Sequence, residues 1–541
     1  MDSPREEPRK DGLIVDKIDV QHNEDALRET DRQMSAWQCL RQNPKIVFWT
    51  LYANSKLSLP IGSTLVGFEN LALSVCLAMP AFHTQNSANK HQPPLRRKTF
   101  ATEVNGQLII PAYWQSAWSA MYNVMMIFGS FAAGYMQDWL GRRSVILLAS
   151  VVAAAGIAVT FVSKTSPQFL GGKIIAGFSV GLFTTTTQTY VSEIAPLPIR
   201  GMALSVNTIM MNLGLLIAIS TSFSRVAIMD ESAFRVVFAA AWAFPGIIAL
   251  GLPFLPESPT WLVFKNRHDK ARKALQQLSG PSEDIDARLA QIIDNVETER
   301  RMQLEAASFA ECFRGTNWRR TRIILICFYV PQVIGAVLSS NAPYFLNQTG
   351  LSSATVLMLV QVGIAAGVVS ALVNAFLMMR LRHRPLMFFG VGVCVAMYFA
   401  MGVAAAFPKT QTSLLVIGIA LVFTSISYGP AVGASMAVAG EVSASKLRAK
   451  SLGIGVAFSS VVSTIWTIVL PYLFNVDQLN MGGHIGWIFF GMGILMLFVL
   501  YFDVPGTKGR TFEELDIMFE LGISARKFEK YKLNEGPADT E

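Results

Sequence analysis

The chain has 541 residues, of which 52% are hydrophobic and 15% are charged. On a water-soluble protein this composition would leave large apolar patches exposed, so it excludes an assembly of soluble domains. The net charge of +8 does not indicate a nucleic-acid partner, because the basic residues gather in alternate short loops between apolar runs. We therefore expect a protein that crosses the lipid bilayer many times.

In chain order, the first element is residues 1–45, which mix charges of both signs and lack the apolar core of a signal peptide. This pattern predicts a disordered cytoplasmic tail. Runs of about 20 apolar residues, enough to span a bilayer, then recur through the chain. We place twelve of them near 56–78, 112–136, 144–163, 168–190, 203–223, 236–255, 322–345, 355–378, 386–407, 413–437, 452–474 and 484–503.

A polar interruption separates the first six runs from the last six. Within it, charges at helical spacing between residues 267 and 305 predict amphipathic cytoplasmic helices, with a flexible linker as the alternative. We thus predict an all-α membrane protein with twelve transmembrane helices in two six-helix bundles. The expected domains are a tail at 1–45, an N-terminal bundle at 46–255, a cytoplasmic helical linker at 256–320, a C-terminal bundle at 321–503 and a cytoplasmic tail at 504–541.

The basic residues of the short loops predict the orientation. One side carries Arg142, Arg143, Arg200, Arg380, Arg382, Arg384, Lys446, Arg448 and Lys450, and the other side carries few. The positive-inside rule places this basic side, with both termini, in the cytoplasm. The longer loop 82–111 is an exception, because it would be external and yet contains Arg96, Arg97 and Lys98. No organelle signal is visible, so the plasma membrane is the default expectation.

The turn after the second run combines an acid, two arginines and spaced glycines in Gly134-Tyr-Met-Gln-Asp138-Trp-Leu-Gly141-Arg142-Arg143. Charge this dense cannot lie in hydrocarbon, so the segment must be a tight aqueous turn between two membrane helices. An ordinary anchoring turn would need only basic residues. The acid and the glycines therefore indicate a specific contact between helices.

Two other cytoplasmic turns share one spacing, a glutamate followed seven residues later by an arginine. The pairs are Glu193 with Arg200 and Glu441 with Arg448. Such acid–base pairs at the end of a bundle can hold the two halves together on one side and must break for that side to open. The alternative is that each glutamate only caps its own helix.

These motifs together resemble those of the sugar porters of the major facilitator superfamily, and most of all fungal α-glucoside permeases. The resemblance covers roughly residues 58 to 528. It rests on the Gly134–Arg143 turn, Tyr190-Val-Ser-Glu-Ile-Ala-Pro196, Pro256-Glu257-Ser258-Pro259 and Pro505-Gly-Thr507-Lys508-Gly509-Arg510. Weaker matches are Gly67-Phe-Glu69, Trp114-Gln115-Ser and Pro471-Tyr-Leu-Phe-Asn475. The resemblance implies the major facilitator fold and transport by alternating access.

Glu69 is the acid inside the membrane to which we assign a function, because an unpaired carboxylate among apolar residues is costly. In proton-coupled sugar porters this position is usually Asp and faces a basic residue, usually Arg, of the fourth helix. The resemblance therefore implies that Lys173 is the partner of Glu69. We expect the pair to couple transport to protons, with protonation of Glu69 freeing Lys173. The alternative is a static ion pair near the outer surface.

The expected substrate site departs from the family pattern. The resemblance implies amide side chains at the positions of Thr208, Val337 and Ala457 and a tryptophan near Gly433, so the cavity is less polar and less aromatic than a hexose site. The candidate substrate-binding residues are Gln115, Asn207, Thr208, Gln332, Asn341 and Tyr344. Each amide could instead join two helices.

The charged turns supply the expected cytoplasmic gate. Its residues are Asp138, Arg142, Arg143, Glu193, Arg200, Glu257, Arg384, Glu441 and Arg448. The second-half copy of the Gly134–Arg143 motif has Met379 in place of its acid and Arg382-His383-Arg384 in place of Gly-Arg-Arg. The second-half gate is therefore expected to depend on Arg384, Glu441 and Arg448. Asn347-Gln-Thr349 matches a glycosylation sequon in an external turn.

The expected function is secondary active transport of a sugar, a glucoside or a similar small organic solute with proton coupling. No phosphate-binding loop occurs, so an ATP-driven pump is excluded, and neither an enzymatic reaction, a cofactor nor a metal is expected. We expect a monomer whose partners are the bilayer, protons and a small substrate. The main alternative is a transporter or exporter of a less polar specialised metabolite, and a nutrient-sensing transceptor is a minor one.

Overall fold

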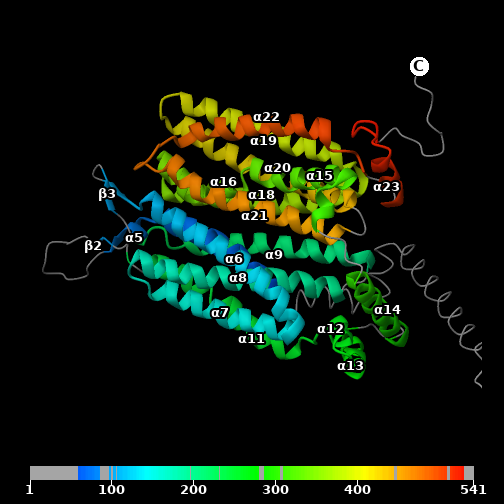
Figure 1. Ribbon diagram of the computed structural model, residues 1–541. Helices are drawn as coiled ribbons and strands as arrows, with labels where there is room; N and C mark the ends of the chain where they lie inside the picture. Colours follow the sequence, from blue (N-terminus) through cyan, green and yellow to red (C-terminus); the bar gives the residue numbers. More distant parts are fainter. Residues whose placement is uncertain are drawn as a thin grey trace, which may run out of the picture.

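The computed structural model describes residues 59–85, 97–98, 102–104, 107–194, 197–228, 230, 232–278, 285–304, 309–443, 447–507 and 512–528. The expected tail at 1–45 lies outside these residues, as does the end of the tail at 504–541. The described part is dominated by long helices that lie side by side in one bundle (Figure 1).

The first half of the chain forms a group of packed helices, here called the first lobe. Its members are α4 (Leu59–Leu77), α5 (Pro80–His83), α6 (Ala112–Leu140), α7 (Arg142–Val162), α8 (Ser166–Ile194), α9 (Leu197–Phe223), α10 (Ser232–Ala240) and α11 (Ala243–Gly251). α6 and α7 pack on α8, and α4 packs on α9. A Cβ atom at Gly67 would lie 1.8 Å from the carbonyl oxygen of Met211. Only glycine allows α4 and α9 to approach so closely.

The second half forms the second lobe. Its helices are α15 (Gly315–Val333), α16 (Ala336–Ser340), α17 (Ala342–Thr349), α18 (Ser353–Arg380), α19 (His383–Ala406), α20 (Gln411–Val442), α21 (Arg448–Phe474) and α22 (Ile485–Asp503). The run predicted at 322–345 is broken where Gly335 adopts φ +80°, and a Cβ atom there would lie 2.1 Å from the hydroxyl of Tyr398. This left-handed conformation and the lack of space both require glycine.

The helices confirm a multi-pass membrane protein. Among the described residues, nine helical segments are long and apolar enough to cross a membrane. The helices α4, α6 and α9 occupy the three remaining predicted spans. The number of twelve crossings stays a prediction.

The two ends of the bundle differ (Figure 1). One end, here called the hairpin end, carries two small antiparallel strand pairs that were not expected from the sequence. In them β1 (Thr84–Gln85) pairs with β2 (Arg97–Lys98), and β3 (Thr102–Val104) pairs with β4 (Gln107–Ile109). The short η3 (Gly482–His484) precedes α22.

The opposite end is here called the linker end. It carries η1 (Leu252–Phe254), α12 (Pro259–Phe264), α13 (His268–Leu278), α14 (Ile285–Leu304), η2 (Phe309–Phe313) and α23 (Phe512–Glu520). The hydroxyl of Ser258 caps α12 by accepting a hydrogen bond from the backbone N–H of Trp261. Trp261, Val263, Ala274 and Val296 form a small core that joins α12, α13 and α14. The amphipathic helices expected between the two bundles are therefore present.

Candidate functional site

A buried ion pair joins α4 to α8 inside the first lobe. The Lys173 Nζ atom lies 2.8 Å from Glu69 Oε2, and the two side chains are 2% and 6% exposed. Both residues therefore meet as the sequence predicted. Removing one partner of such a pair leaves a buried charge without compensation, which costs about 3–5 kcal/mol.

Aromatic rings surround the ammonium group of Lys173. Its Nζ lies 5.7 Å from the centre of the Tyr122 ring and 5.9 Å from those of Phe169 and Phe238. The ring faces attract a cation, so they give the ammonium favourable contacts besides Glu69. The Tyr122 hydroxyl donates to Asn70 Oδ1 at 3.2 Å. If Glu69 accepts a proton, its ionic attraction to Lys173 is lost while the rings remain in place.

Two of the candidate substrate residues have unused polar atoms. Asn207 accepts from the Ser63 hydroxyl at 3.3 Å, and Gln332 donates to the Ser459 hydroxyl at 3.5 Å. Asn207 Nδ2 and Gln332 Oε1 are buried and make no hydrogen bond with any described group. A buried polar atom without a partner is costly, so each is suited to bind a polar ligand group or a water molecule.

The other candidate substrate residues have different surroundings. Gln115 and Tyr344 bond to each other at 3.1 Å between the two lobes. The Asn341 amide donates at 2.9 Å to the carbonyl of Val337, one turn before it. The side chain of Thr208 lies outside the described part of the structure. The six residues therefore do not form one cluster of mutual contacts among the described side chains.

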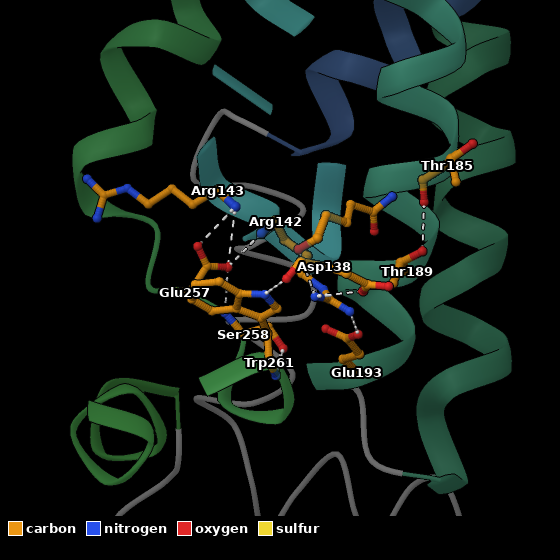
Figure 2. Close-up of polar contacts among 10 residues, drawn as sticks. Asp138, Arg142, Arg143, Thr185, Thr189, Glu193, Glu257, Ser258 and Trp261 are labelled. Atoms are coloured by element: carbon orange, nitrogen blue, oxygen red, sulfur yellow. Dashed lines mark hydrogen bonds and ion pairs between the residues drawn. The ribbon is translucent and has the colours of Figure 1, made fainter. Parts of the chain in front are cut away.

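The first lobe carries a charged cluster at the linker end (Figure 2). Arg142 Nη2 donates to Glu193 Oε1 at 2.7 Å, and Arg142 Nη1 donates to the carbonyl of Gln137 at 3.1 Å. Asp138 Oδ1 lies 3.7 Å from Arg142 Nη1, but its side chain is 68% exposed. The Arg142–Glu193 pair is largely buried, with side chains 10% and 13% exposed. It is therefore the stronger of the two contacts.

Glu257 caps the start of α7 in the same cluster (Figure 2). Its carboxylate accepts from the backbone N–H groups of Arg142 at 2.9 Å and of Arg143 at 3.3 Å. Gly141 precedes the helix with φ +87°, and a Cβ atom there would lie 2.6 Å from Glu257 Oε2. A negative charge at a helix N-terminus is stabilising, and glycine leaves the room for it.

Trp261 fixes α12 to this cluster, because its indole N–H donates to the carbonyl of Asp138 at 3.1 Å. The Tyr190 hydroxyl similarly donates to the carbonyl of Pro256 at 2.8 Å. The linker is thus joined to the first lobe by neutral hydrogen bonds as well as by Glu257. The side chain of Arg200 lies outside the described part of the structure, so its expected contact with Glu193 is not described.

The second lobe arranges its linker end differently. Glu441 Oε1 lies 3.3 Å from His383 Nε2, whereas Arg384 donates to the carbonyl of Tyr501 at 2.7 Å. Arg448, the first residue of α21, is exposed. No role for His383 was predicted from the sequence. Aligning the two copies of the motif identifies His383 as the counterpart of Arg142, since His383 follows Met379 by four residues as Arg142 follows Asp138.

Asn347, the residue of the predicted sequon, lies in α17 and donates to the Ser353 hydroxyl at 3.0 Å. Among the residues that the structure describes, no group of three or more His, Cys, Asp or Glu side chains is suited to hold a metal ion.

Comparisons with known proteins agree with this arrangement. Residues 57–519 match the family model described as sugar (and other) transporter. Over 527 residues the chain is 28% identical to the MFS transporter fmqE of Aspergillus fumigatus, with 95% of each chain covered. It is 25% identical over 523 residues to the general alpha-glucoside permease of Saccharomyces cerevisiae, covering 95% of this chain and 82% of the permease.

Solved structures show the same fold. The inward-open xylose transporter XylE from E. coli superposes with a TM-score of 0.66 at 20% identity, covering 86% of this chain and 99% of XylE. The all-helical membrane architecture predicted from the sequence is therefore that of a known transporter fold.

Proposed function

The chain belongs to the sugar (and other) transporter family of the major facilitator superfamily, and from that premise we propose that it couples the movement of a small organic solute to protons. The family and the relatives are transporters rather than enzymes. Transport by this fold requires two lobes that expose a shared site to each side in turn. The proposal therefore needs a group whose charge changes and a set of polar atoms that can hold the solute.

The observation that carries the proposal is the Glu69–Lys173 pair at 2.8 Å. A buried carboxylate that has a single ammonium partner is the simplest group that binds a proton at the expense of an internal contact. In the deprotonated state Glu69 holds α4 against α8 through Lys173. In the protonated state the pair is broken, and the balance between the two lobe arrangements shifts.

The substrate class that we propose is a sugar, a glucoside or a related polyhydroxylated solute. The family description and the alpha-glucoside permease support this class. The free Asn207 Nδ2 donor and the free Gln332 Oε1 acceptor support it chemically, because hydroxyl groups are held by paired donors and acceptors.

A less polar specialised metabolite is the second candidate. The MFS transporter fmqE, which aligns with 95% of this chain, carries no sugar in its name, unlike the alpha-glucoside permease. The apolar residues Val337 and Ala457 at positions where the family pattern implies amides point the same way. Such a solute would use fewer hydrogen bonds and more apolar contact.

We further propose that the hairpin end faces outward and the linker end faces the cytoplasm of a plasma-membrane protein. The basic short loops support this orientation through the positive-inside rule. It places the Arg142–Glu193 and His383–Glu441 contacts on the cytoplasmic side, as expected for gating residues, and Asn347 toward the outside.

Substitution of Glu69 by Gln tests proton coupling in purified proteoliposomes. We expect accumulation driven by a pH gradient to disappear, while exchange of labelled solute across the membrane continues. Unchanged uphill accumulation would contradict the proposal. Because the single variant leaves Lys173 buried and unpaired, the double variant Glu69→Gln with Lys173→Met is needed to preserve folding. It too should exchange solute without accumulating it.

The exposed pair Arg272–Asp286, with side chains 53% and 66% exposed, provides the control. Asp286→Asn removes a carboxylate of similar chemistry whose partner Arg272 is exposed, so it should leave accumulation unchanged. Uptake and efflux of labelled sugars, glucosides and apolar metabolites in the same vesicles would then separate the two substrate classes.

A further inference from the structure

Hydrogen bonds that cross between the two lobes gather at the hairpin end. The Gln115 amide nitrogen, on α6, donates to the Tyr344 hydroxyl on α17 at 3.1 Å and to Asn475 Oδ1, at the end of α21, at 3.2 Å. Asn475 Nδ2 donates in turn to the carbonyl of Ile110, next to β4, at 2.9 Å. We call Gln115, Tyr344, Asn475 and the Ile110 carbonyl the clasp.

The clasp is buried and its members satisfy one another. Gln115 is 2% exposed, and Tyr344 and Asn475 are fully covered. The Gln115 amide nitrogen also donates to the Ile110 carbonyl at 2.7 Å, so its two N–H groups are shared among three acceptors and this oxygen accepts from both lobes. The Tyr344 ring packs edge-on against Phe474, with ring centres 5.8 Å apart. Burial of these amide and hydroxyl groups is tolerated because each has a partner across the lobe interface.

A second contact beside the clasp also depends on both lobes. The helix α6 begins after Pro111 without a capping side chain of its own, and its first N–H, that of Ala112, donates to Asp477 Oδ2 at 3.3 Å. A carboxylate near a helix N-terminus is stabilising. Here it comes from the other lobe, so the start of α6 is capped only while the two lobes meet at this end.

The clasp contains no charged group, which suits a contact that must break and reform. Separated amides and hydroxyls can bond to water, whereas a buried ion pair would leave two charges to be resolvated. Moving the lobes apart at the hairpin end must break the contacts of Gln115 with Tyr344 and Asn475, because these two partners belong to the other lobe. A hydrogen bond within one lobe would be unaffected by that movement.

We propose that the clasp is the gate that closes the hairpin end of the solute pathway and that its separation opens that end. The inference rests on the proposed transport by alternating lobes, but it does not depend on proton coupling or on the identity of the solute. It assigns Gln115 and Tyr344 to gating in place of the substrate contact expected from the sequence. It also adds Asn475, which belongs to the weaker family match Pro471-Tyr-Leu-Phe-Asn475 and had no role assigned from the sequence.

The test uses Tyr344→Phe, which removes the hydroxyl and keeps the ring against Phe474. Opening is measured with Ser116→Cys as a reporter, because Ser116 is 4% exposed and bonds to the Ile468 carbonyl across the lobes. A membrane-impermeant maleimide is applied from the hairpin side without solute or pH gradient. The chain lacking the reporter cysteine gives the background from the native cysteines.

The matched control is Tyr398→Phe, in which a tyrosine 1% exposed loses a hydrogen bond to the Ile334 carbonyl inside one lobe. We expect Tyr344→Phe to raise the labelling rate of the reporter about fivefold, the factor that corresponds to losing one typical hydrogen bond of about 1 kcal/mol. Tyr398→Phe should leave the rate unchanged. Asn475→Ala, which removes both of its amide contacts, should raise labelling further.

Equal labelling of the two tyrosine variants would overturn the proposal, since both lose a buried hydroxyl and only one loses a contact between lobes. Labelling that rises from the linker side instead of the hairpin side would overturn it as well. Because no solute or proton gradient is used, failure of the Glu69 experiment leaves this result standing, and failure here leaves proton coupling untouched.

Discussion

At the linker end of the first lobe, Arg142 donates to Glu193 at 2.7 Å, and at the matching place in the second lobe His383 lies 3.3 Å from Glu441. The basic partner is a guanidinium in the first lobe and an imidazole in the second, and only the guanidinium presents a fork of N–H donors to a carboxylate. The repeat has thus kept the position of an acid–base contact and changed its basic partner.

The surroundings of the two contacts also differ, because acidic side chains reinforce the first-lobe contact and are missing at the matching places of the second lobe. The first lobe adds Asp138 beside Arg142 and Glu257 at the start of α7. In the second lobe, Met379 stands at the position of Asp138. Gly506 follows the last helix of the second lobe, at the place that Glu257 has after the last helix of the first lobe. The helix α19 accordingly starts without a capping side chain. We infer that the first lobe is the firmly held half at this end and that the second lobe is the adjustable one.

The largest expected effect comes from breaking the first-lobe contact. Arg142→Gln leaves Glu193 buried without its cation, and we expect the free energy of unfolding to fall by about 3–5 kcal/mol. Thermal unfolding of the detergent-purified protein measures this loss, and solute exchange in vesicles should slow in parallel. Arg272→Gln, at the exposed pair with Asp286, should cost no more than about 1 kcal/mol. Equal losses in both variants would show that the Arg142 contact is an ordinary surface pair.

A smaller effect is expected from the α7 cap, which only the first lobe has. Glu257→Gln keeps an acceptor oxygen but removes the negative charge from the helix start, so it should cost about 1 kcal/mol of unfolding free energy. Glu297, exposed on α14, supplies the control through Glu297→Gln, which should change little. A cost from Glu257→Gln indistinguishable from that of Glu297→Gln would mean that the cap is held by geometry rather than by charge.

Much of the fold follows from patterns within short stretches of sequence. Runs of apolar residues located the helices because a membrane helix has to satisfy its backbone and cover itself with apolar side chains locally. The break at Gly335 was not predicted, and the Tyr398 hydroxyl that leaves room only for glycine there comes from another helix. The strands between 84 and 109 were missed for a related reason, because such short strands are defined by their partners.

The functional residues divide in the same way, into those that a local pattern identifies and those that depend on contacts between distant parts of the chain. Glu69 was identified from its apolar neighbours alone, whereas Lys173 was assigned only through the family resemblance. The contact of Gln115 with Asn475 joins residues 360 positions apart, and no local pattern indicates it. His383 could have been identified by aligning the two copies of the motif. Because the family pattern has an arginine, the second-half gate was assigned to the neighbouring Arg384 instead.

The smallest expected effect concerns the second-lobe contact. The charged groups on the helices packed against this end of α19 are Glu441 on α20 and Asp503 on α22, of which Asp503 pairs with Arg322. Glu441 is therefore the acid that His383 contacts. The Glu441 side chain is 33% exposed, so the contact should contribute no more than about 1 kcal/mol.

Two substitutions test this contact at one fixed pH. His383→Gln removes the imidazole, whereas His383→Arg restores the residue type that the first lobe has at the matching place. We expect His383→Gln to lower the free energy of unfolding by no more than about 1 kcal/mol and His383→Arg to be at least as stable as the native protein, because a guanidinium pairs well with a carboxylate. Thermal unfolding of the detergent-purified protein measures both. A His383→Arg variant no more stable than His383→Gln would show that Glu441 does not hold a basic partner here, and the contact would then be no counterpart of the Arg142–Glu193 pair.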